Sequence, residues 1–223
     1  MSEVESGRWL LIGGTALVLV ALLLSGIAPF DRVTWGLEVA PAVIALPILW
    51  LTRKRFPLTP LLYGLVFLHA LVLIYGGAYT YARVPLGFEI QAWFDLGRNP
   101  YDKIGHFFQG MVPALVAREI LIRGHFARGP WMVEFLAICV AMTVSAGYEL
   151  IEWGAAVVAG GGAVEFLGTQ GDPWDAQSDM AFALLGAVLA VTAVSRWHDR
   201  QIERLTSPDT MPISRRTSRG GSD

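Results

Sequence analysis

Three separate stretches of the chain place acidic side chains at helical spacing, two of them with a histidine or a tyrosine. Residues three or four positions apart share one face of a helix, so each stretch can direct a pair of polar groups inward. The pairs are Asp102 with His106, Tyr148 and Glu149 with Glu152, and Asp175 with Asp179. Carboxylates with an imidazole are typical of general acid–base catalysis and of sites for Zn²⁺, Mn²⁺ or Mg²⁺.

These carboxylates stand in or beside apolar segments, where an ionised group costs several kcal/mol unless it is paired, protonated or bound to a metal. Nearby basic residues are few: chiefly Lys103 and His106, with Arg83 and Arg98 as further candidates. Either some of the carboxyl groups are protonated, or a bound cation neutralises them.

We predict a role for each polar residue in this region, with a divalent metal ion (Zn²⁺, Mn²⁺ or Mg²⁺) as the cofactor or with none. The predicted metal ligands are His106, Glu149, Asp175 and Asp179. The predicted catalytic residues are His106, Glu149, Glu152 and Asp102. The predicted substrate-binding residues are Lys103, Tyr148, Gln170 and Asp172.

The composition indicates the elements that position these residues. Of 223 residues, 54% are hydrophobic and only 16% are charged, which indicates a membrane protein and excludes a disordered chain or a nucleic-acid binder. Because a spanning helix needs about 20 apolar residues, we predict an all-α transmembrane bundle of six spans in one domain, residues 1–204. The spans are 9–27, 35–51, 58–79, 102–122, 131–158 and 175–197. Residues 205–223 are predicted to form a disordered cytoplasmic tail.

The second span is interrupted by Pro41 and Pro47, so a re-entrant segment is an alternative there. With a cytoplasmic N-terminus, thirteen of the 17 Lys and Arg residues fall on the cytoplasmic side and four on the other. The positive-inside rule then places both termini in the cytoplasm. Under this topology the acidic pairs, although they come from three segments, all lie near the extracytoplasmic face.

Two similar octets begin the fourth and sixth spans and form a small internal repeat with a constant offset. Residues 99–106 read NPYDKIGH and residues 172–179 read DPWDAQSD. We expect Asn99 and Asp172 to be N-caps, with the following prolines in the first helical position. Two helix N-termini at one level favour an anionic ligand.

Three blocks of the sequence resemble the bacterial YjdF-type inner-membrane proteins, a family of predicted membrane proteins without an assigned activity. The blocks are residues 99–110, 148–153 and 168–180. The Asp-Lys-x-x-His-Phe start of one helix and the Tyr-Glu pair of the next are also similar, more distantly, to VanZ-like membrane proteins. The resemblance implies a multi-pass protein of the bacterial cytoplasmic (inner) membrane and supports the importance of the polar residues named above.

Three functions remain open at this stage. One is a metal-dependent hydrolase or transferase acting on a lipid or on a lipid-linked anionic substrate. The second is a proton- or cation-coupled transporter, which should carry ionisable groups across the full bilayer. The third is a non-enzymatic scaffold that binds a lipid headgroup. Membrane lipids are the expected partners in each case.

Overall fold

The computed structural model describes residues 2–159 and 170–207, and within these ranges every regular element is a helix. In chain order the helices are α1 (Glu3–Ile27), α2 (Arg32–Thr52), α3 (Pro60–Ala78), α4 (Pro85–Phe94), α5 (Tyr101–Arg123), α6 (Pro130–Ala159), α7 (Asp175–Leu189), the π-helical turn η2 (Ala190–Val194) and α8 (Ser195–Thr206). The predicted all-α fold is therefore confirmed for the described part of the chain. The predicted tail lies outside the described residues from residue 208 onward, and α8 continues to Thr206, just past the expected end of the domain.

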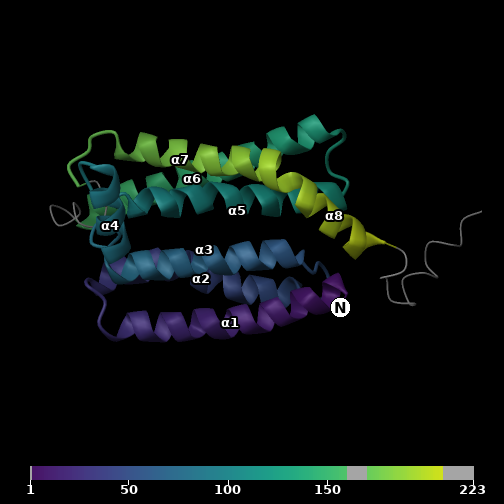
Figure 1. Cartoon of the computed structure of the whole chain (residues 1–223), viewed down its shortest axis with the longest axis horizontal. Coiled ribbons are helices and arrows are strands. Elements are labelled where there is room, and N and C mark those ends of the chain that lie inside the picture. Colours follow the sequence, from purple (N-terminus) through teal and green to yellow (C-terminus); the bar gives the residue numbers. More distant parts are fainter. Residues whose placement is uncertain (1, 160–169, 208–223) are drawn as a thin grey trace, which may run out of the picture.

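The long helices form two layers that lie side by side (Figure 1). Helices α1, α2 and α3 pack together in one layer, and α5, α6 and α7 pack together in the other. The layers meet mainly where α3 packs against α5. Helix α5 therefore has neighbours on several sides, which makes it the central helix of the bundle.

Within residues 2–159 and 170–207, five segments are long and apolar enough to cross a membrane: α1, α2, α3, α6 and the continuous rod from α7 through α8. Helix α5 has 23 residues, enough to cross, but its polar residues make its mean hydropathy too low for it to be counted with these five. Its position explains this composition. Because α5 is covered by α3, α6 and α7, its polar side chains face protein rather than lipid.

The structure corrects several predicted details. Helix α2 is continuous although Pro41 and Pro47 lie inside it, so the segment is not re-entrant in this structure. The spanning helices also begin and end one to several residues from most of the predicted bounds, except that α1 ends at Ile27 and α7 begins at Asp175, where the predicted spans do. Helix α4 was not predicted, because long apolar runs indicate membrane spans and its ten residues are too few to span a membrane.

Helices α5 and α7 run parallel at close range. A Cβ atom on Gly110 of α5 would overlap the backbone of Ala183 on α7, and one on Gly186 would overlap the Phe107 carbonyl. Gly110 and Ala183 are separated by the same number of residues as His106 and Asp179. His106 and Asp179 form an ion pair across the two helices. The sequence offset of the repeat is thus the spatial register between these two helices.

Candidate functional site

The site is built at the starts of α5 and α7, at the end of the bundle that also carries α4 (Figure 1). Asn99 and Asp172 precede these helices in equivalent ways. The Asn99 side chain accepts a hydrogen bond from the Tyr101 N–H, and the Asp172 side chain accepts one from the Trp174 N–H. The two side chains therefore form turns that lead into the helices. The prediction that they are N-caps is wrong, because α5 begins at Tyr101 and α7 at Asp175.

Gln170 holds the two helix starts together. Its side chain accepts a hydrogen bond from the Asn99 N–H at 3.1 Å and donates one to the Asn99 carbonyl at 3.0 Å. The amide of Asn99 in turn donates to the Val84 carbonyl, just before α4. In this structure the polar groups of Gln170, a predicted substrate contact, are thus engaged with the backbone of Asn99.

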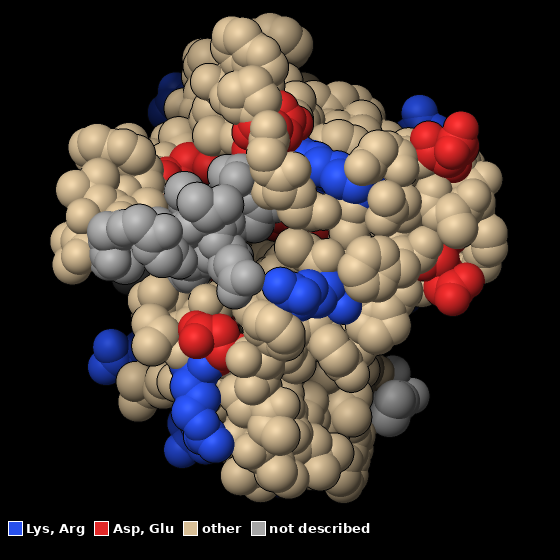
Figure 2. Space-filling model, turned by 90° about the vertical axis from the view of Figure 1, so that its left-hand side faces the viewer, with Lys and Arg blue, Asp and Glu red and all other residues tan. Residues whose placement is uncertain are grey.

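A ladder of ion pairs joins the basic residues to the carboxylates of α7. Lys103 Nζ donates to Asp175 Oδ1 at 3.0 Å and to Asp179 Oδ1 at 2.6 Å, and also to the Ser178 hydroxyl. Arg98 pairs with Asp175 at 2.5 Å and with Asp172 at 3.2 Å. Asp175 is thus neutralised by two cations. In Figure 2, which faces this end, basic side chains border a recess with acidic atoms at its bottom.

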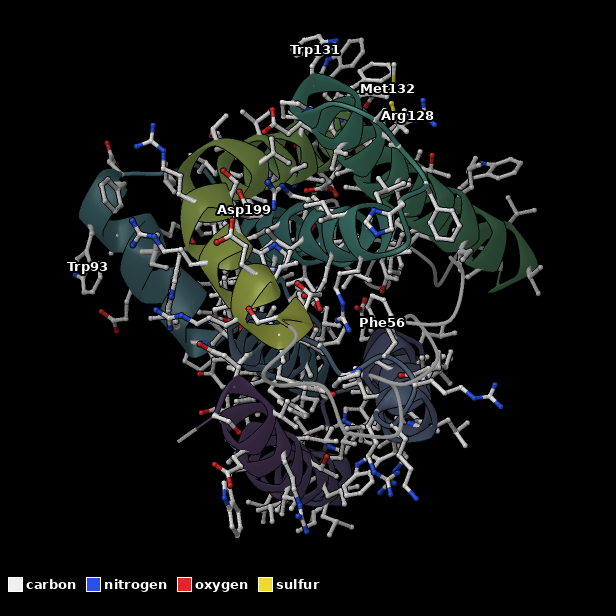
Figure 3. The ribbon with its side chains drawn as sticks, turned by 90° about the vertical axis from the view of Figure 1, so that its right-hand side faces the viewer. Phe56, Trp93, Arg128, Trp131, Met132 and Asp199 are labelled. Atoms are coloured by element: carbon white, nitrogen blue, oxygen red, sulfur yellow. The ribbon has the colours of Figure 1, made fainter. Side chains whose placement is uncertain are left out.

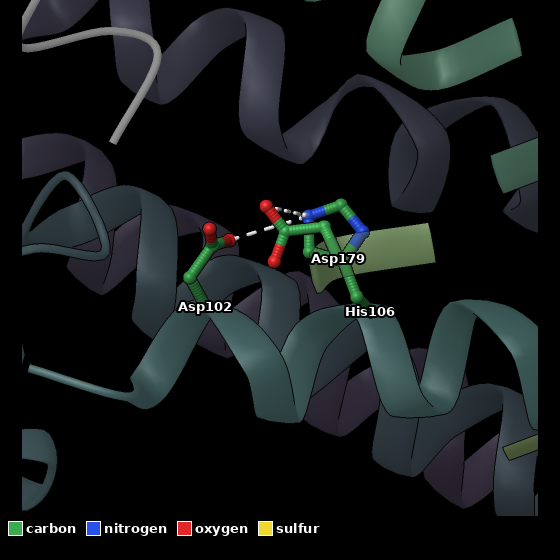
Figure 4. A group of neighbouring side chains, drawn as sticks. All are labelled: Asp102, His106 and Asp179. Atoms are coloured by element: carbon green, nitrogen blue, oxygen red, sulfur yellow. Dashed lines mark ion pairs between the residues drawn. The ribbon is translucent and has the colours of Figure 1, made fainter. Parts of the chain in front are cut away.

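His106 lies among three carboxylates from three helices, its own included. Its Nε2 atom is 3.4 Å from Asp102 Oδ1 and 3.9 Å from Asp179 Oδ2 (Figure 4). It is also 3.7 Å from Glu149 Oε1. Its Nδ1 atom is 3.0 Å from Oε1 of Gln109. Because a carbonyl oxygen only accepts, Nδ1 is the donor of this hydrogen bond. When His106 is protonated, Nε2 pairs with the carboxylates; when it is neutral, Nε2 presents its lone pair to them.

The spacing of this group suits a metal ion. Asp102, His106 and Asp179 can each offer one ligand atom, all within 4.8 Å of one another. Two ligands of a tetrahedral zinc ion are about 3.3–3.6 Å apart, since metal–ligand bonds are about 2.0–2.2 Å long. The distance from Nε2 to Asp102 lies in this range, those to Glu149 and Asp179 are longer, and all three are long for hydrogen bonds. Oε1 of Glu149 is buried without a hydrogen-bond partner, which leaves it available to a cation.

This arrangement differs from the predicted ligand set in one residue. Asp175 is held by Lys103 and Arg98, whereas Asp102, which was predicted as catalytic, lies beside His106 Nε2. Helical spacing could not distinguish the two aspartates, because each stands four residues before its partner. Which aspartate is left to face His106 depends on where the Lys103 and Arg98 side chains contact α7.

A pocket opens beside His106, between the two layers. Glu38 of α2 is 4% exposed and lines it together with Asp102, Glu152 and Tyr148. The Tyr148 hydroxyl donates a 3.0 Å hydrogen bond to Glu38. The remaining lining residues are Leu73, Tyr81, Gly105, His106 and Gln109. Glu38 was not assigned to the site from the sequence, although it stands near the end of its span on the predicted extracytoplasmic side, the same signal that identified the other acids.

A second buried polar cluster lies at the opposite end of the bundle. Glu119 of α5 accepts hydrogen bonds from His198 at 2.9 Å, from Arg123 at 2.6 Å and from both the N–H and the hydroxyl of Thr59. Nearby, Arg118 forms a bidentate pair with Asp199 of α8. Asp199 is labelled in Figure 3, which faces this end of the bundle. Glu119 is fully buried with several donors, so it fastens α8 to the ends of α3 and α5.

Comparisons with known proteins identify relatives but no activity. The chain is 58% identical over 196 residues to "Inner membrane protein YjdF" of Escherichia coli (strain K12), an alignment that covers 87% of this chain and 94% of that protein. No solved structure matches the chain. The comparisons do not show the more distant similarity to VanZ-like proteins. Residues 10–200 match the family described as "Predicted membrane protein (DUF2238)", and the chain therefore belongs to this family of membrane proteins.

Proposed function

We propose that this protein is a metal-dependent hydrolase or transferase of the bacterial inner membrane, acting on a lipid or a lipid-linked anionic substrate. Its centre is the group formed by Asp102, His106 and Asp179, with Glu149 beside it. The inner-membrane location is supported by the YjdF relative, which carries that description.

The proposed topology has six spans, with α5 as the sixth and both termini in the cytoplasm. Support for α5 comes from its 23 residues, about 35 Å of helix, and from its place among helices that are apolar enough to span. Support for the orientation comes from the distribution of Lys and Arg, thirteen against four. The site end of the bundle is then extracytoplasmic.

The observation that carries the proposal is the uneven pairing of charge at the site. Lys103 and Arg98 pair with the carboxylates at the start of α7. The carboxylates of Asp102 and Glu149 have His106 as the basic group of their ion pairs, and Glu38 and Glu152 stand nearby in the pocket. A divalent cation would neutralise this excess and account for the ligand-like spacing around Nε2.

The residues around the centre have distinct roles in such a site. A divalent metal ion, when bound, supplies Lewis acidity and a more acidic bound water. Gln109 orients the His106 ring through Nδ1, as partners of metal-binding histidines do. Glu149, whose Oε1 atom is buried without a hydrogen-bond partner, is placed to accept a proton from a water near His106. Lys103 fixes Asp179 by a 2.6 Å contact.

A coupled transporter is less well supported by this structure. His106 and Glu119 both lie on α5, about 20 Å apart along the helix axis at a rise of about 1.5 Å per residue. Between them the buried residues of α5 are apolar or glycine: Gly110, Met111, Val112, Ala114, Leu115 and Ala117, with Arg118 directly before Glu119. Along α5 the two polar clusters are thus separated by an apolar stretch, although His69 of α3, with a buried Nε2, stacks on Phe108 of this helix. A transport path needs polar groups across the bilayer.

The test is the metal content of detergent-purified protein after incubation with Zn²⁺, Mn²⁺ or Mg²⁺, measured by inductively coupled plasma mass spectrometry. We expect about one ion per chain in the wild type and loss of that ion in His106→Ala, Asp102→Asn and Asp179→Asn. Glu89→Gln, an exposed acid of α4 at the same end, is the matched control and should keep the metal. A wild type with no more metal than His106→Ala would overturn the proposal.

Turnover is tested next with the loaded protein in vesicles. Phosphate-ester lipids and lipid-linked phosphates are the substrates to screen, with release of the headgroup or phosphate as the readout. We expect activity that is lost in Glu149→Gln. A metal-loaded protein that turns over none of these lipids would leave a headgroup-binding role in place of an enzyme.

A further inference from the structure

Helix α4 presents a concentration of exposed apolar side chains. Phe88 is 50% exposed, and Trp93 and Phe94 are each 70% exposed, with Leu86 also on the surface. Gly87 is the buried residue of the helix. A ten-residue helix with this much exposed apolar surface needs a covering that a monomer in water would not supply.

The orientation of α4 differs from that of the long helices. In Figure 1 it runs across the end of the bundle, whereas the long helices run along it. Figure 3 looks along the bundle and places Trp93 at the perimeter, with its side chain pointing away from the other helices. The apolar surface of α4 therefore faces sideways, in the direction in which the long helices face lipid.

Exposed tryptophans mark two levels along the bundle. Trp131 and Trp153 stand near opposite ends of α6, about 33 Å apart at a helical rise of about 1.5 Å per residue. Trp174 and Trp197, also exposed, are separated by about 35 Å along the rod from α7 to α8 at the same rise. Both separations match the hydrocarbon core of about 30 Å, and tryptophan is enriched at its two boundaries. One boundary thus runs through Trp153 and Trp174.

Helix α4 is fastened at the level of Trp174. The Asn99 side-chain amide donates to the Val84 carbonyl directly before α4. The Asn99 side chain also packs so closely on Gly87 that a Cβ atom there would overlap it. After α4, Arg98 pairs with Asp175, the residue that follows Trp174. Both ends of α4 are therefore tied to the helix starts that carry the site.

We propose that α4 is an interfacial helix that lies in the plane of the membrane. Its exposed side chains Leu86, Phe88, Trp93 and Phe94 insert among the lipid headgroups and the upper part of the acyl chains. Lipid is the occupant because α4 lies at the level of the Trp153 and Trp174 boundary and faces sideways, and because it is too short to span. This inference stands independently of any catalysis at the site.

The position of α4 has a consequence for the site beneath it. Because α4 is tied to Asn99 and Arg98, directly before α5, an α4 at headgroup depth would place the start of α5, with Asp102 and His106, close to that depth. A lipid headgroup can then reach the pocket without leaving the bilayer plane.

The test is nitroxide scanning by electron paramagnetic resonance in lipid vesicles, on a Cys139→Ala background, since Cys139 is the one native cysteine. Labels are placed by Trp93→Cys and Phe94→Cys. Val144→Cys, an exposed position in the middle of α6, is the control for the hydrocarbon core. Lys54→Cys, exposed in the loop after α2, is the control for water. Accessibility to oxygen is compared with accessibility to a water-soluble nickel complex.

We expect the α4 labels to give oxygen-to-nickel ratios between those of the two controls, as headgroup depth requires. A ratio equal to that of Lys54→Cys would place α4 in water and overturn the proposal. A ratio equal to that of Val144→Cys would place it in the hydrocarbon core and would also overturn it. Immobilised labels with low accessibility to both reagents would show a protein contact instead, with the same consequence.

Discussion

The hydroxyl of Tyr148 on α6 donates a 3.0 Å hydrogen bond to Glu38 Oε2 on α2. The two residues belong to different layers of the bundle, and α2 and α6 otherwise hardly pack against each other. Their hydrogen bond therefore joins the layers at the pocket and supplies the buried Glu38 carboxyl with a donor.

Removal of that donor should weaken the fold near the site. In Tyr148→Phe, Glu38 loses a hydrogen bond in a buried place, which costs about 1–3 kcal/mol. We expect a lower midpoint of unfolding in detergent for Tyr148→Phe than for the wild type. Glu38→Gln should lower the midpoint less in the Tyr148→Phe background than in the wild type. Tyr79→Phe, at an exposed position of the same end, is the control. Additive effects of the two substitutions would contradict a direct interaction.

Lys103 should be required for the stability of the site end. In Lys103→Met, Asp179 loses the 2.6 Å contact that neutralises it, and breaking a buried ion pair from one side costs about 3–5 kcal/mol. The double variant Lys103→Met/Asp179→Asn should regain part of this loss, because no unpaired charge remains on Asp179. The measurement is unfolding in mixed detergent micelles, with exposed Lys54→Met as the control. A double variant as unstable as the sum of both changes would argue against the pairing.

The close approach of α5 and α7 predicts strong effects at two glycines. Gly110→Val and Gly186→Val should destabilise the bundle by about 3 kcal/mol, because the new side chains would meet the backbone of the facing helix. Gly147→Ala on α6, where a Cβ has open space, should be neutral or stabilising by up to about 1 kcal/mol. Thermal unfolding in detergent compares them. Equal effects at all three glycines would show that helix propensity, not packing, sets the result.

The Glu119 cluster should matter for folding and not for metal binding. The Glu119 carboxylate pairs with Arg123 and lies 2.9 Å from His198. Because Glu119→Gln removes this charge, we expect a marked loss of stability. Protein that remains folded should hold as much metal as the wild type, because the site lies about 20 Å away along α5. Size-exclusion chromatography followed by metal analysis separates the two effects. Loss of metal from folded Glu119→Gln would show that the two ends are coupled.

The proposed orientation predicts which loops are reached from outside the cell. On the Cys139→Ala background, Gly97→Cys, at an exposed position after α4, should react with a membrane-impermeant maleimide in intact cells whose outer membrane has been opened. Lys54→Cys should react only after the inner membrane is broken. The reverse pattern would invert the topology.

The sequence indicated which polar segments lie together, but not how their charges pair. Helical spacing placed His106 with Asp102 and Glu152 with Glu149, and the common depth of the acids brought three segments together. The spacing could not show that Lys103 reaches across to α7 and pairs with Asp175, because side-chain reach between helices depends on their separation. For the same reason Glu38 was missed, since its partner Tyr148 lies on a helix far along the chain.

The helical class and the five described segments that are apolar enough to cross a membrane follow from the sequence alone, because apolar runs of sufficient length form helices in lipid whatever surrounds them. The repeated octet likewise indicated the equivalence of the starts of α5 and α7. Only the tertiary structure decided that α5 is the central helix, that Asp175 is neutralised by Lys103 and Arg98, and that Asp102 and Asp179 face His106. The physical reason is that charge neutralisation at a buried site depends on distances of a few ångströms between helices, which no pattern within one helix contains.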